Sequence, residues 1–528
     1  MNAGTALLTR LALRRERGIA PWWILLTATM GLVMVAYIDR NMGTYELKLA
    51  YTEVIHRNAF FQGLGGGFVE PRTEVLATWR SGGFLYLINA FAALMTVVRH
   101  TRREEDAGRS ELVRAGVVGR RAPLTAALLV AGANSLIGGA LAAAALIAAG
   151  LDPVGTLAYG AAIVAAGWVF AGVAAVAAQL ASNARTATVI GLYVLGVAYV
   201  MRYAGDATGR LWLKALSPVG WSHLVSAYQG ERWWLLGVSV AAAVVLCAVA
   251  YALVGRRDLG SGLLPERPGK ESAPGLRGPV SLAWRLHRGL LAKWAVAMTA
   301  FAALGGALGP LARDFLSRPS IVVTNIANLL GVAQDDLLDG YMWYFILILA
   351  YCIALFPVLM IMRLRSEESS GRAEAVQSTP LTRVRWAAGH LVVAALGTVV
   401  LLALAALAFS TVYALLLGDF AAPRFLAAAL SEAPAAWCVG ALCLLAYGLL
   451  PRASVALCWV VWILTAALGQ VVAPFYGVWG GTPFEPFHYV PNTVAGQPYG
   501  TVPVLVLLAL TALLTTAGLL ALRRRDFG

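Results

Sequence analysis

The chain contains few charged residues. Asp, Glu, Lys and Arg make up 13% of its 528 residues, whereas soluble globular proteins contain about 25%. So few charges cannot cover a water-exposed surface, which argues against an ordinary cytosolic enzyme, a secreted disulfide scaffold or a disordered chain. Hydrophobic residues account for 59% of the sequence, and the mean hydropathy is +0.72. These values predict that most of the chain lies in lipid.

Motifs for metal, nucleotide or catalytic chemistry are also missing. The five cysteines lie in apolar runs and show no CxxC or Cys/His spacing. The six histidines form no HExxH motif, and no G-x-S-x-G elbow occurs. At Gly269-Lys270 a phosphate-binding loop would need an earlier glycine, where Leu264 stands, and a Ser or Thr in place of Glu271. The sequence therefore proposes no metal site, no bound cofactor and no enzyme active site.

The net charge of +14 would suggest a nucleic-acid partner in a soluble protein. In a membrane protein the same excess is explained by Lys and Arg in the cytoplasmic loops. We therefore expect no nucleic-acid partner.

Long apolar runs predict an all-α polytopic membrane protein with about twelve spans, each needing about 20 residues. The predicted spans are 21–38, 83–99, 124–149, 156–181, 186–203, 233–254, 292–309, 341–362, 388–417, 426–449, 454–474 and 502–522. With the N-terminus inside, the inner segments carry more than twice as many Lys and Arg residues as the outer ones. This bias predicts a plasma-membrane protein with both termini in the cytoplasm.

The sequence repeats itself after about half its length. The pattern R-x-E-E-x-x-G-R-x-E occurs at 102–111 and again at 365–374, after the second and eighth predicted spans. Arg256-Arg257-Asp258 ends the first half, and Arg524-Arg525-Asp526 ends the second. We therefore predict two parallel six-span halves, 1–254 and 289–528, joined by a cytoplasmic linker and an amphipathic helix at 255–288.

Each copy of the repeated charge motif is expected to form a short helix at the membrane surface. Glu105 and Arg109 would then be i,i+4 partners, as would Glu368 and Arg372, each pair contributing only about 0.2–0.5 kcal/mol. A glycine inside such a helix costs about 1 kcal/mol, so the glycine in each copy predicts close approach by another group. A solvated loop would explain the charge alone, but the recurrence of the same residues favours a docking surface for a cytoplasmic partner.

A basic amphipathic segment precedes each half. Leu7, Leu8 and Leu11 share one helical face, and Arg10, Arg14 and Arg17 share another. Before the seventh span, Leu282, Leu286 and Leu290 lie opposite Arg285 and Arg288 in the same way. We expect helices in the plane of the inner membrane surface, although an ordinary basic flank of a span would look similar.

These motifs resemble those of the permease subunits of ABC-2-type (type V) exporters. The six-plus-six layout is similar to the fused actinobacterial group described as polyketide-antibiotic or tetronasin-type exporters. The resemblance implies a permease that binds no cofactor and pairs with a separate ATPase subunit, in two copies, which holds ATP and Mg. It implies coupling helices that dock on this partner, formed by Glu104, Glu105, Gly108, Arg109 and Glu111 and by Glu367, Glu368, Gly371, Arg372 and Glu374.

The resemblance also implies export of a small hydrophobic or amphipathic substrate along the second and fifth spans of each half. The polar and aromatic candidates there are Tyr86, Asn89, Phe91, Tyr193, Tyr199, Trp343, Tyr344, Tyr351, Trp459, Trp462 and Gln470. Aromatic residues in spans more often pack against neighbours or lie at the interface. Glu432 is an acid within the tenth span, which makes it a functional candidate or a residue wetted near the outer surface.

Two other classes remain open from the sequence. A secondary transporter of the major-facilitator kind also has six-plus-six parallel repeats. Long outer loops after the first span of each half, and the lack of a convincing set of paired carboxylates and bases, argue against it. A membrane-embedded enzyme acting on lipid would need clustered His, Asp or Glu near one interface, which the sequence does not show.

Overall fold

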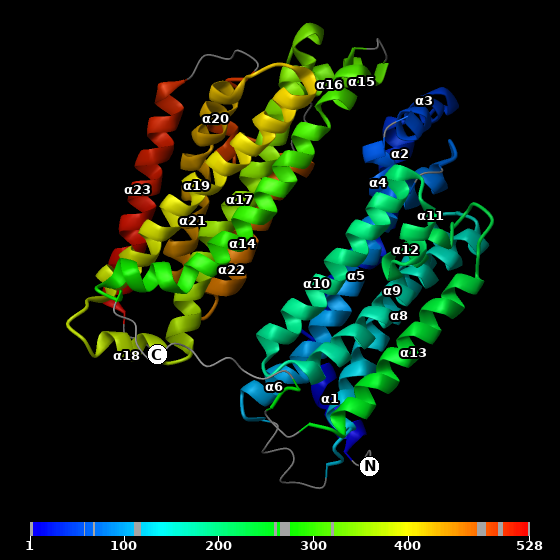
Figure 1. The fold of residues 1–528 in the computed structure, drawn as a ribbon, viewed down its shortest axis with the longest axis horizontal. Coiled ribbons are helices and arrows are strands. Elements are labelled where there is room, and N and C mark those ends of the chain that lie inside the picture. Colours follow the sequence, from blue (N-terminus) through cyan, green and yellow to red (C-terminus); the bar gives the residue numbers. More distant parts are fainter. Residues whose placement is uncertain are drawn as a thin grey trace. The chain divides into compact units, whose positions relative to one another are not determined.

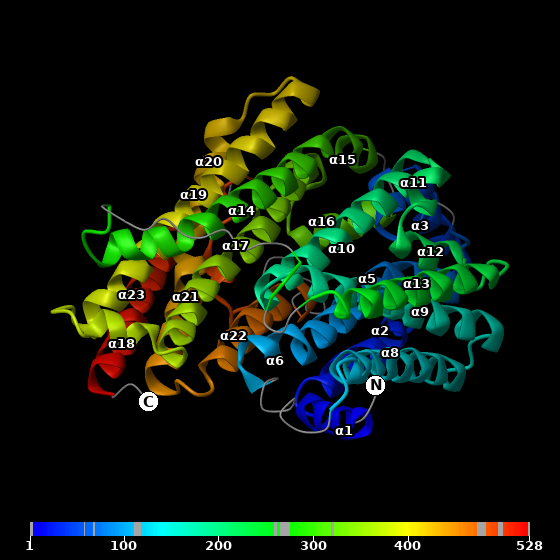
Figure 2. The ribbon, with the colours of Figure 1, turned by 60° about the horizontal axis from the view of Figure 1, so that its bottom comes forward.

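The computed structural model describes residues 4–57, 59–66, 69–109, 118–257, 261–263, 275–317, 321–472, 482–494 and 500–525. Secondary structure in this part of the chain is helical, without a strand. The chain divides into two compact units, Met1–Gly269 and Lys270–Gly528. Each unit is a bundle of long helices (Figures 1 and 2).

The first unit is built around α5 and α9. Its helices are α1 (Thr5–Glu16), α2 (Ala20–Asn41), α3 (Tyr45–Arg57), α4 (Ala59–Gly65), α5 (Thr73–His100), α6 (Arg102–Asp106), α8 (Ala122–Ala148), α9 (Pro153–Leu180), α10 (Ala184–Thr208), α11 (Leu211–Ala215), α12 (Pro218–Leu224) and α13 (Trp234–Val254). Small residues let α8 and α9 touch backbone to backbone, since a Cβ on Gly160 would lie 2.6 Å from the Gly139 carbonyl oxygen. Such small-residue contacts are common between membrane helices.

The second unit is built around α17, α19 and α21. Its helices are α14 (Pro279–Ala307), α15 (Gly309–Leu316), α16 (Ile321–Leu330), η1 (Gln334–Asp336), α17 (Leu337–Ser369), α18 (Arg372–Gln377), α19 (Arg383–Leu417), α20 (Ala422–Ser431), α21 (Ala433–Leu449), α22 (Ser454–Ala467), the π-helical η2 (Leu468–Val472), η4 (Pro486–Tyr489) and α23 (Thr501–Arg524). Gly448 on α21 and Gly518 on α23 again allow close contact, since a Cβ on Gly448 would lie 2.6 Å from the Gly518 carbonyl oxygen.

Among the described residues, eleven segments are long and apolar enough to cross a membrane. The predicted span at 454–474 differs, because its helix is shorter and ends in a π-helical turn. The predicted span at 426–449 is divided at Glu432, where α20 ends and α21 begins. The fold is nevertheless the predicted all-α polytopic one.

The two amphipathic segments differ from each other. In the first unit α1 is a separate helix, and three residues separate it from α2. In the second unit the amphipathic segment is the beginning of α14, which continues into the seventh predicted span. The amphipathic segment therefore leads into the span within one helix, with Gly289 at the predicted boundary, and its in-plane position stays a prediction.

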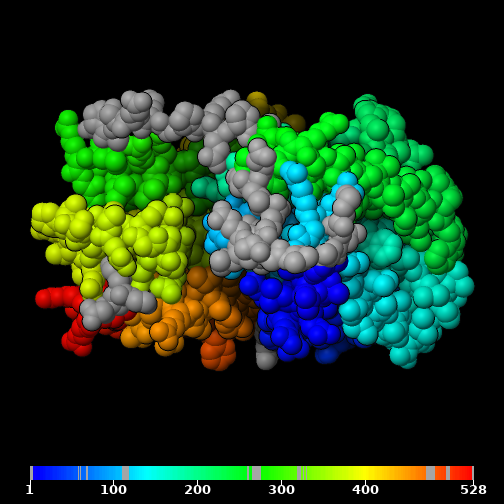
Figure 3. Space-filling view, turned by 90° about the horizontal axis from the view of Figure 1, so that it is seen from below, coloured from blue at the N-terminus to red at the C-terminus, as the bar shows by residue number. Residues whose placement is uncertain are grey.

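The repeated charge motif marks one end of each unit, which we call its motif end, and we call the opposite end its far end. In the first unit α6 and the N-terminus lie at the motif end, and in the second α18 and the C-terminus do (Figure 1). Seen from below, α1 forms part of the surface of the first unit and the α18 region part of that of the second (Figure 3).

Candidate functional site

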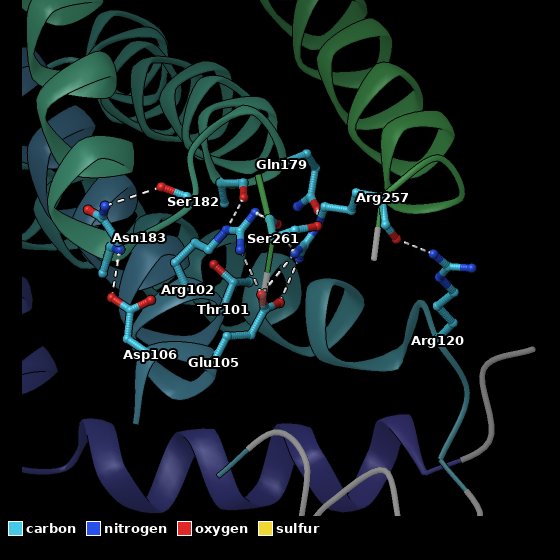
Figure 4. A network of polar contacts seen from close by, with 12 residues as sticks. Thr101, Arg102, Glu105, Asp106, Arg120, Gln179, Ser182, Asn183, Arg257 and Ser261 are labelled. Carbon is cyan, nitrogen blue, oxygen red and sulfur yellow. Dashed lines mark hydrogen bonds and ion pairs between the residues drawn. The ribbon is translucent and has the colours of Figure 1, made fainter. Parts of the chain in front are cut away.

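At the motif end of the first unit, a buried ion pair ties the charge motif to the end of α13. The Glu105 side chain, 9% exposed, accepts hydrogen bonds from Arg257 at 2.6 and 2.8 Å. Arg102, which is fully buried, donates to the same carboxylate at 2.9 Å. Arg102 also donates to the carbonyl oxygens of Ala178 and Ser261 (Figure 4). The motif is therefore fixed to its own bundle on one side.

The second unit repeats this arrangement with the equivalent residues. Glu368, whose side chain is 3% exposed, accepts two hydrogen bonds of 2.8 Å from Arg525. Arg365 lies 3.4 Å from the same carboxylate, and the Tyr447 hydroxyl donates to it at 2.5 Å. The side chains of Glu105 and Glu368 thus point into their own units.

A second layer of the network is also repeated. Arg120 donates to the backbone carbonyl of Arg257, and Arg383 donates to that of Arg525. Arg257 and Arg525 are the functional residues that the motif analysis missed, although the repeated R-R-D ending in the sequence contained the signal. The second arginine of each R-R-D ending is the one that reaches Glu105 in the first unit and Glu368 in the second.

The predicted i,i+4 ion pairs are wrong. Arg109 pairs with Glu104 at 2.8 Å, and Arg372 pairs with Glu367 at 2.8 Å. Both ion pairs therefore have i,i+5 spacing and not i,i+4 spacing. A continuous helix would bring i and i+4 together, but each helix ends before the arginine. Glu105 and Glu368 are occupied by the buried arginines instead.

The expectation that a neighbour approaches the motif glycines is also wrong. Gly108 has φ 69° and Gly371 has φ 72°, and a Cβ on either would meet open space. The glycines therefore provide a left-handed turn, which other residues adopt at a cost of about 1–2 kcal/mol.

Only part of the predicted docking surface is accessible. Arg109, Arg372 and Glu374 are exposed, whereas Glu104 is 22% and Glu367 9% exposed at their side chains. Glu111 lies outside the described residues. The docking role of these residues stays a prediction for each unit.

Helix α1 is attached directly to the motif of the first unit. Arg15 pairs with Glu104 at 2.5 Å, and the buried Glu16 accepts hydrogen bonds of 2.7 Å from Arg99 and His100 at the end of α5. In the second unit the beginning of α14 is held differently, by a hydrogen bond of 2.8 Å between the buried His287 and His390. Both amphipathic segments are thus coupled to the helices that carry or flank the motif.

The pathway candidates of the second unit form a polar chain at its far end. Tyr344 donates to Gln470 at 2.7 Å, and Tyr351 donates to Glu485 at 2.7 Å. The Trp462 indole donates to the Tyr351 carbonyl at 3.0 Å. Trp343 is buried and Trp459 is 38% exposed.

Glu485 is a second residue that sequence reasoning missed. It occupies the position of Ser217 in the first unit, and both cap a short helix by accepting from a backbone N–H. Burial raises the pKa of the Glu485 carboxyl to about 7. Glu432 is also buried, 1% exposed, so the suggestion that it is wetted near the outer surface is wrong. The signal for Glu485 was that Glu485-Pro486 stands 268 positions after Ser217-Pro218, so the second half departs from the first at this residue.

The pathway candidates of the first unit do not share one surface. Tyr86 is buried with its ring 4.9 Å from that of His223, and Asn89 donates to the Ile163 carbonyl at 2.7 Å. Phe91 is half-buried, 5.9 Å from the ring of Trp23. Tyr193 is 74% exposed on α10, and Tyr199 is half-buried beside Arg202. Their place in a pathway stays a prediction.

Among the described residues, no group of three or more His, Cys, Asp or Glu side chains is arranged to hold a metal ion.

Burial lowers the pKa of His223 well below its ordinary value, which favours a neutral ring.

Comparison with known proteins places the chain in a family. The model of the C-terminal domain of the multidrug efflux system permease Rv1217c matches residues 8–255 and 276–523. The multidrug efflux system permease protein Rv1217c of Mycobacterium tuberculosis (strain ATCC 25618 / H37Rv) is 36% identical over 532 residues, covering 99% of this chain and 95% of the relative. The chain belongs to the Rv1217c family of multidrug efflux system permeases.

The two ranges that the Rv1217c family model matches have equal length. They are offset by the same 268 residues that separate Arg257 from Arg525. Each matched range contains one copy of the charge motif and one long bundle of helices.

Proposed function

We propose that the chain is the transmembrane permease subunit of an ATP-driven ABC exporter of the ABC-2 type. It moves a hydrophobic or amphipathic molecule, antibiotic-like or lipid, out of the cell. A separate ATPase subunit, in two copies, binds ATP and Mg and supplies the energy. The observation that carries the proposal is the 36% identity to a multidrug efflux permease over 99% of the chain.

The geometry at the motif end suits transmission of force from a partner. The exposed turn at Gly108 follows α6, the short helix after α5, and Glu105 in α6 is bonded to Arg257 just after α13. In the second unit the turn at Gly371 follows α17, and Glu368 is bonded to Arg525 at the end of α23. A partner that displaces either turn therefore pulls on two long helices of the same unit.

A secondary transporter is the alternative, and one observation favours it. Glu432 and Glu485 lie buried near each other in the second unit, where an ion-coupled transporter could bind a proton. Such a site is typical of proton relays in membrane helices. This reading would require no ATPase partner, which makes the two functions separable by experiment.

The test is purification of the tagged chain from its native membranes, with assay of the eluate for a co-purifying protein and ATPase activity. The informative variant is Arg109→Glu combined with Arg372→Glu, because both side chains are exposed. Their partner Glu104 keeps its ion pair with Arg15, and their partner Glu367 keeps its ion pair with Arg363. Glu105 and Glu368 are unsuitable, since their substitution would break buried ion pairs. The matched control is Arg210→Glu combined with Arg313→Glu, two exposed arginines at the far ends.

We expect an ATPase to co-elute with the wild-type chain and the control and to be lost from the motif variant. An ATPase that stays bound to the motif variant would overturn the docking site and leave the exporter class standing. Absence of an ATPase from every sample, under conditions shown to preserve such complexes, would overturn the exporter proposal. Proton-driven uptake into vesicles would then be measured with Glu432→Gln.

A further inference from the structure

The far end of the first unit contains a cavity of about 320 Å³ between α3, α4, α5 and α10. Its walls are mostly aromatic and apolar; they include Tyr51, Phe61, Trp79, Phe84, Leu87 and Tyr199. A volume in this range and an apolar lining with few polar groups are typical of small-molecule sites. The network at the motif end does not involve these residues.

The charge that lines this cavity is positive. Arg80 is part of the wall, and no acidic residue is among the described residues that line it. The Arg80 guanidinium is held in place by the Tyr37 ring, 4.6 Å away, and donates to the Tyr51 hydroxyl at 3.2 Å. No ion pair with a carboxylate is formed by Arg80 within the described part of the chain.

A second arginine lies directly behind the wall. The guanidinium carbon of Arg202 is 4.9 Å from the centre of the Tyr199 ring, and its Nη1 donates to the Leu64 carbonyl at 3.1 Å. Arg202 is fully buried, and its Nε and Nη2 have no hydrogen-bond partner among the described residues. The Asp206 carboxylate neutralises only part of the Arg202 charge, because it also pairs with the Lys214 ammonium at 2.6 Å.

We propose that this cavity recognises amphipathic organic anions, namely compounds with an aromatic body and a single carboxylate, sulfonate or phosphate group. The aromatic walls take the apolar body, and the Arg80 guanidinium takes the anion through charge-assisted hydrogen bonds. Arg202 adds a positive field that water screens little at this depth. The assignment deepens the proposed function, on which it rests, by naming a substrate class.

The second unit lacks this charge at the equivalent position. Gln470 stands where the repeat places Arg202, and Thr482 stands where it places Lys214. A purely structural need of the fold would call for the basic residues in both units. The restriction of the positive cluster to the first unit therefore favours a ligand over a role in folding.

The test measures binding of two fluorescent probes that share a dansyl group, anionic dansylglycine and cationic dansylcadaverine. The purified full chain is placed in phosphatidylcholine nanodiscs without ATP, so the result does not depend on an ATPase. We expect dansylglycine to bind at least about tenfold more tightly than dansylcadaverine. Arg80→Gln should weaken dansylglycine binding by about tenfold or more, Arg80→Lys should largely restore it, and the exposed-site control Arg210→Gln should leave it unchanged.

Equal binding of both probes, or dansylglycine binding that survives Arg80→Gln, would overturn the proposal. Leu87→Trp fills the cavity without changing charge and should abolish binding, which keeps the test decisive if Arg80→Gln does not fold. Nanodiscs with added phosphatidylglycerol separate the two sources of the anion. Displacement of the probe by this lipid would assign the site to a lipid headgroup and overturn a transported compound as its occupant.

Discussion

Two glutamates of the second motif, Glu368 and Glu374, carry the same charge but lie in different surroundings. Glu105 and Glu368 are bonded to arginines inside their units, whereas Glu374 is exposed. Removing one member of a buried ion pair leaves the other charge uncompensated and costs about 3–5 kcal/mol. An exposed charge usually changes stability by no more than about 0.5 kcal/mol. The two classes of residue should therefore separate by stability alone.

We predict that Glu368→Gln lowers the midpoint of thermal unfolding in a fixed detergent clearly, while Glu374→Gln leaves it almost unchanged. The double substitution Glu368→Arg with Arg525→Glu should recover part of the loss, because it restores one ion pair with reversed charges. Equal midpoints for Glu368→Gln and Glu374→Gln would show that the network does not stabilise the unit.

Glu485 predicts a dependence of stability on pH. Its carboxyl has an ordinary pKa of 4.5, and burial raises the pKa in the folded protein to about 7. Between these values the folded state binds more protons than the unfolded state, so the free energy of unfolding falls as the pH rises. The slope from this one group approaches about 1.4 kcal/mol per pH unit within the window.

We therefore expect the wild-type chain to unfold at a lower temperature at pH 7 than at pH 5, after subtraction of the profile of Glu485→Gln. Glutamine keeps the acceptor for the backbone N–H of Phe487 but does not titrate. Glu485→Ser, which restores the residue of the first half, should show the same flat profile. A difference profile without slope across this window would contradict the assignment.

At the scale of the helices, the sequence predicted most elements but not how they end. Apolar runs long enough to cross a membrane identified the long helices, because hydropathy over about 20 residues depends little on tertiary context. The ends at Gly108 and Gly371 depend on a left-handed turn, and helix periodicity alone suggested a continuous helix there. Hydropathy also did not predict the interruption at Glu432, where the backbone stays in the right-handed region, or the π-helical turn after α22.

At the scale of the whole molecule, the repeat predicted which residues recur but not what they bind. The same R-x-E-E pattern was interpreted as a surface, yet its second glutamate faces Arg257 or Arg525 more than 150 positions along the chain. Only packing of α5 against the bundle, or of α17 in the second unit, brings such partners together. Differences between the halves were more informative for function. At the far ends, Gln470 of the second half replaces Arg202 of the first, and Glu485 replaces Ser217.

The repeat also makes a prediction for the whole molecule, namely that both motif ends face the cytoplasm. Parallel repeats place equivalent residues on the same side of the membrane, whereas inverted repeats place them on opposite sides. Ala107 and Ser370 are exposed at the two motif ends, and Ser317 is exposed at the far end of the second unit. Single cysteines at these positions report the side, because the described native cysteines are buried or half-buried.

With a membrane-impermeant maleimide on intact cells, we expect Ser317→Cys to be labelled and both Ala107→Cys and Ser370→Cys to be protected until the cells are opened. The unsubstituted chain gives the background from its native cysteines. Opposite behaviour of Ala107→Cys and Ser370→Cys would require inverted halves, and then one ATPase surface could not contact both motifs. Labelling of both in intact cells would place the motif ends outside, where no ATP-driven partner could reach them. Protection of both is therefore a condition that the exporter proposal must meet, independently of any purified complex.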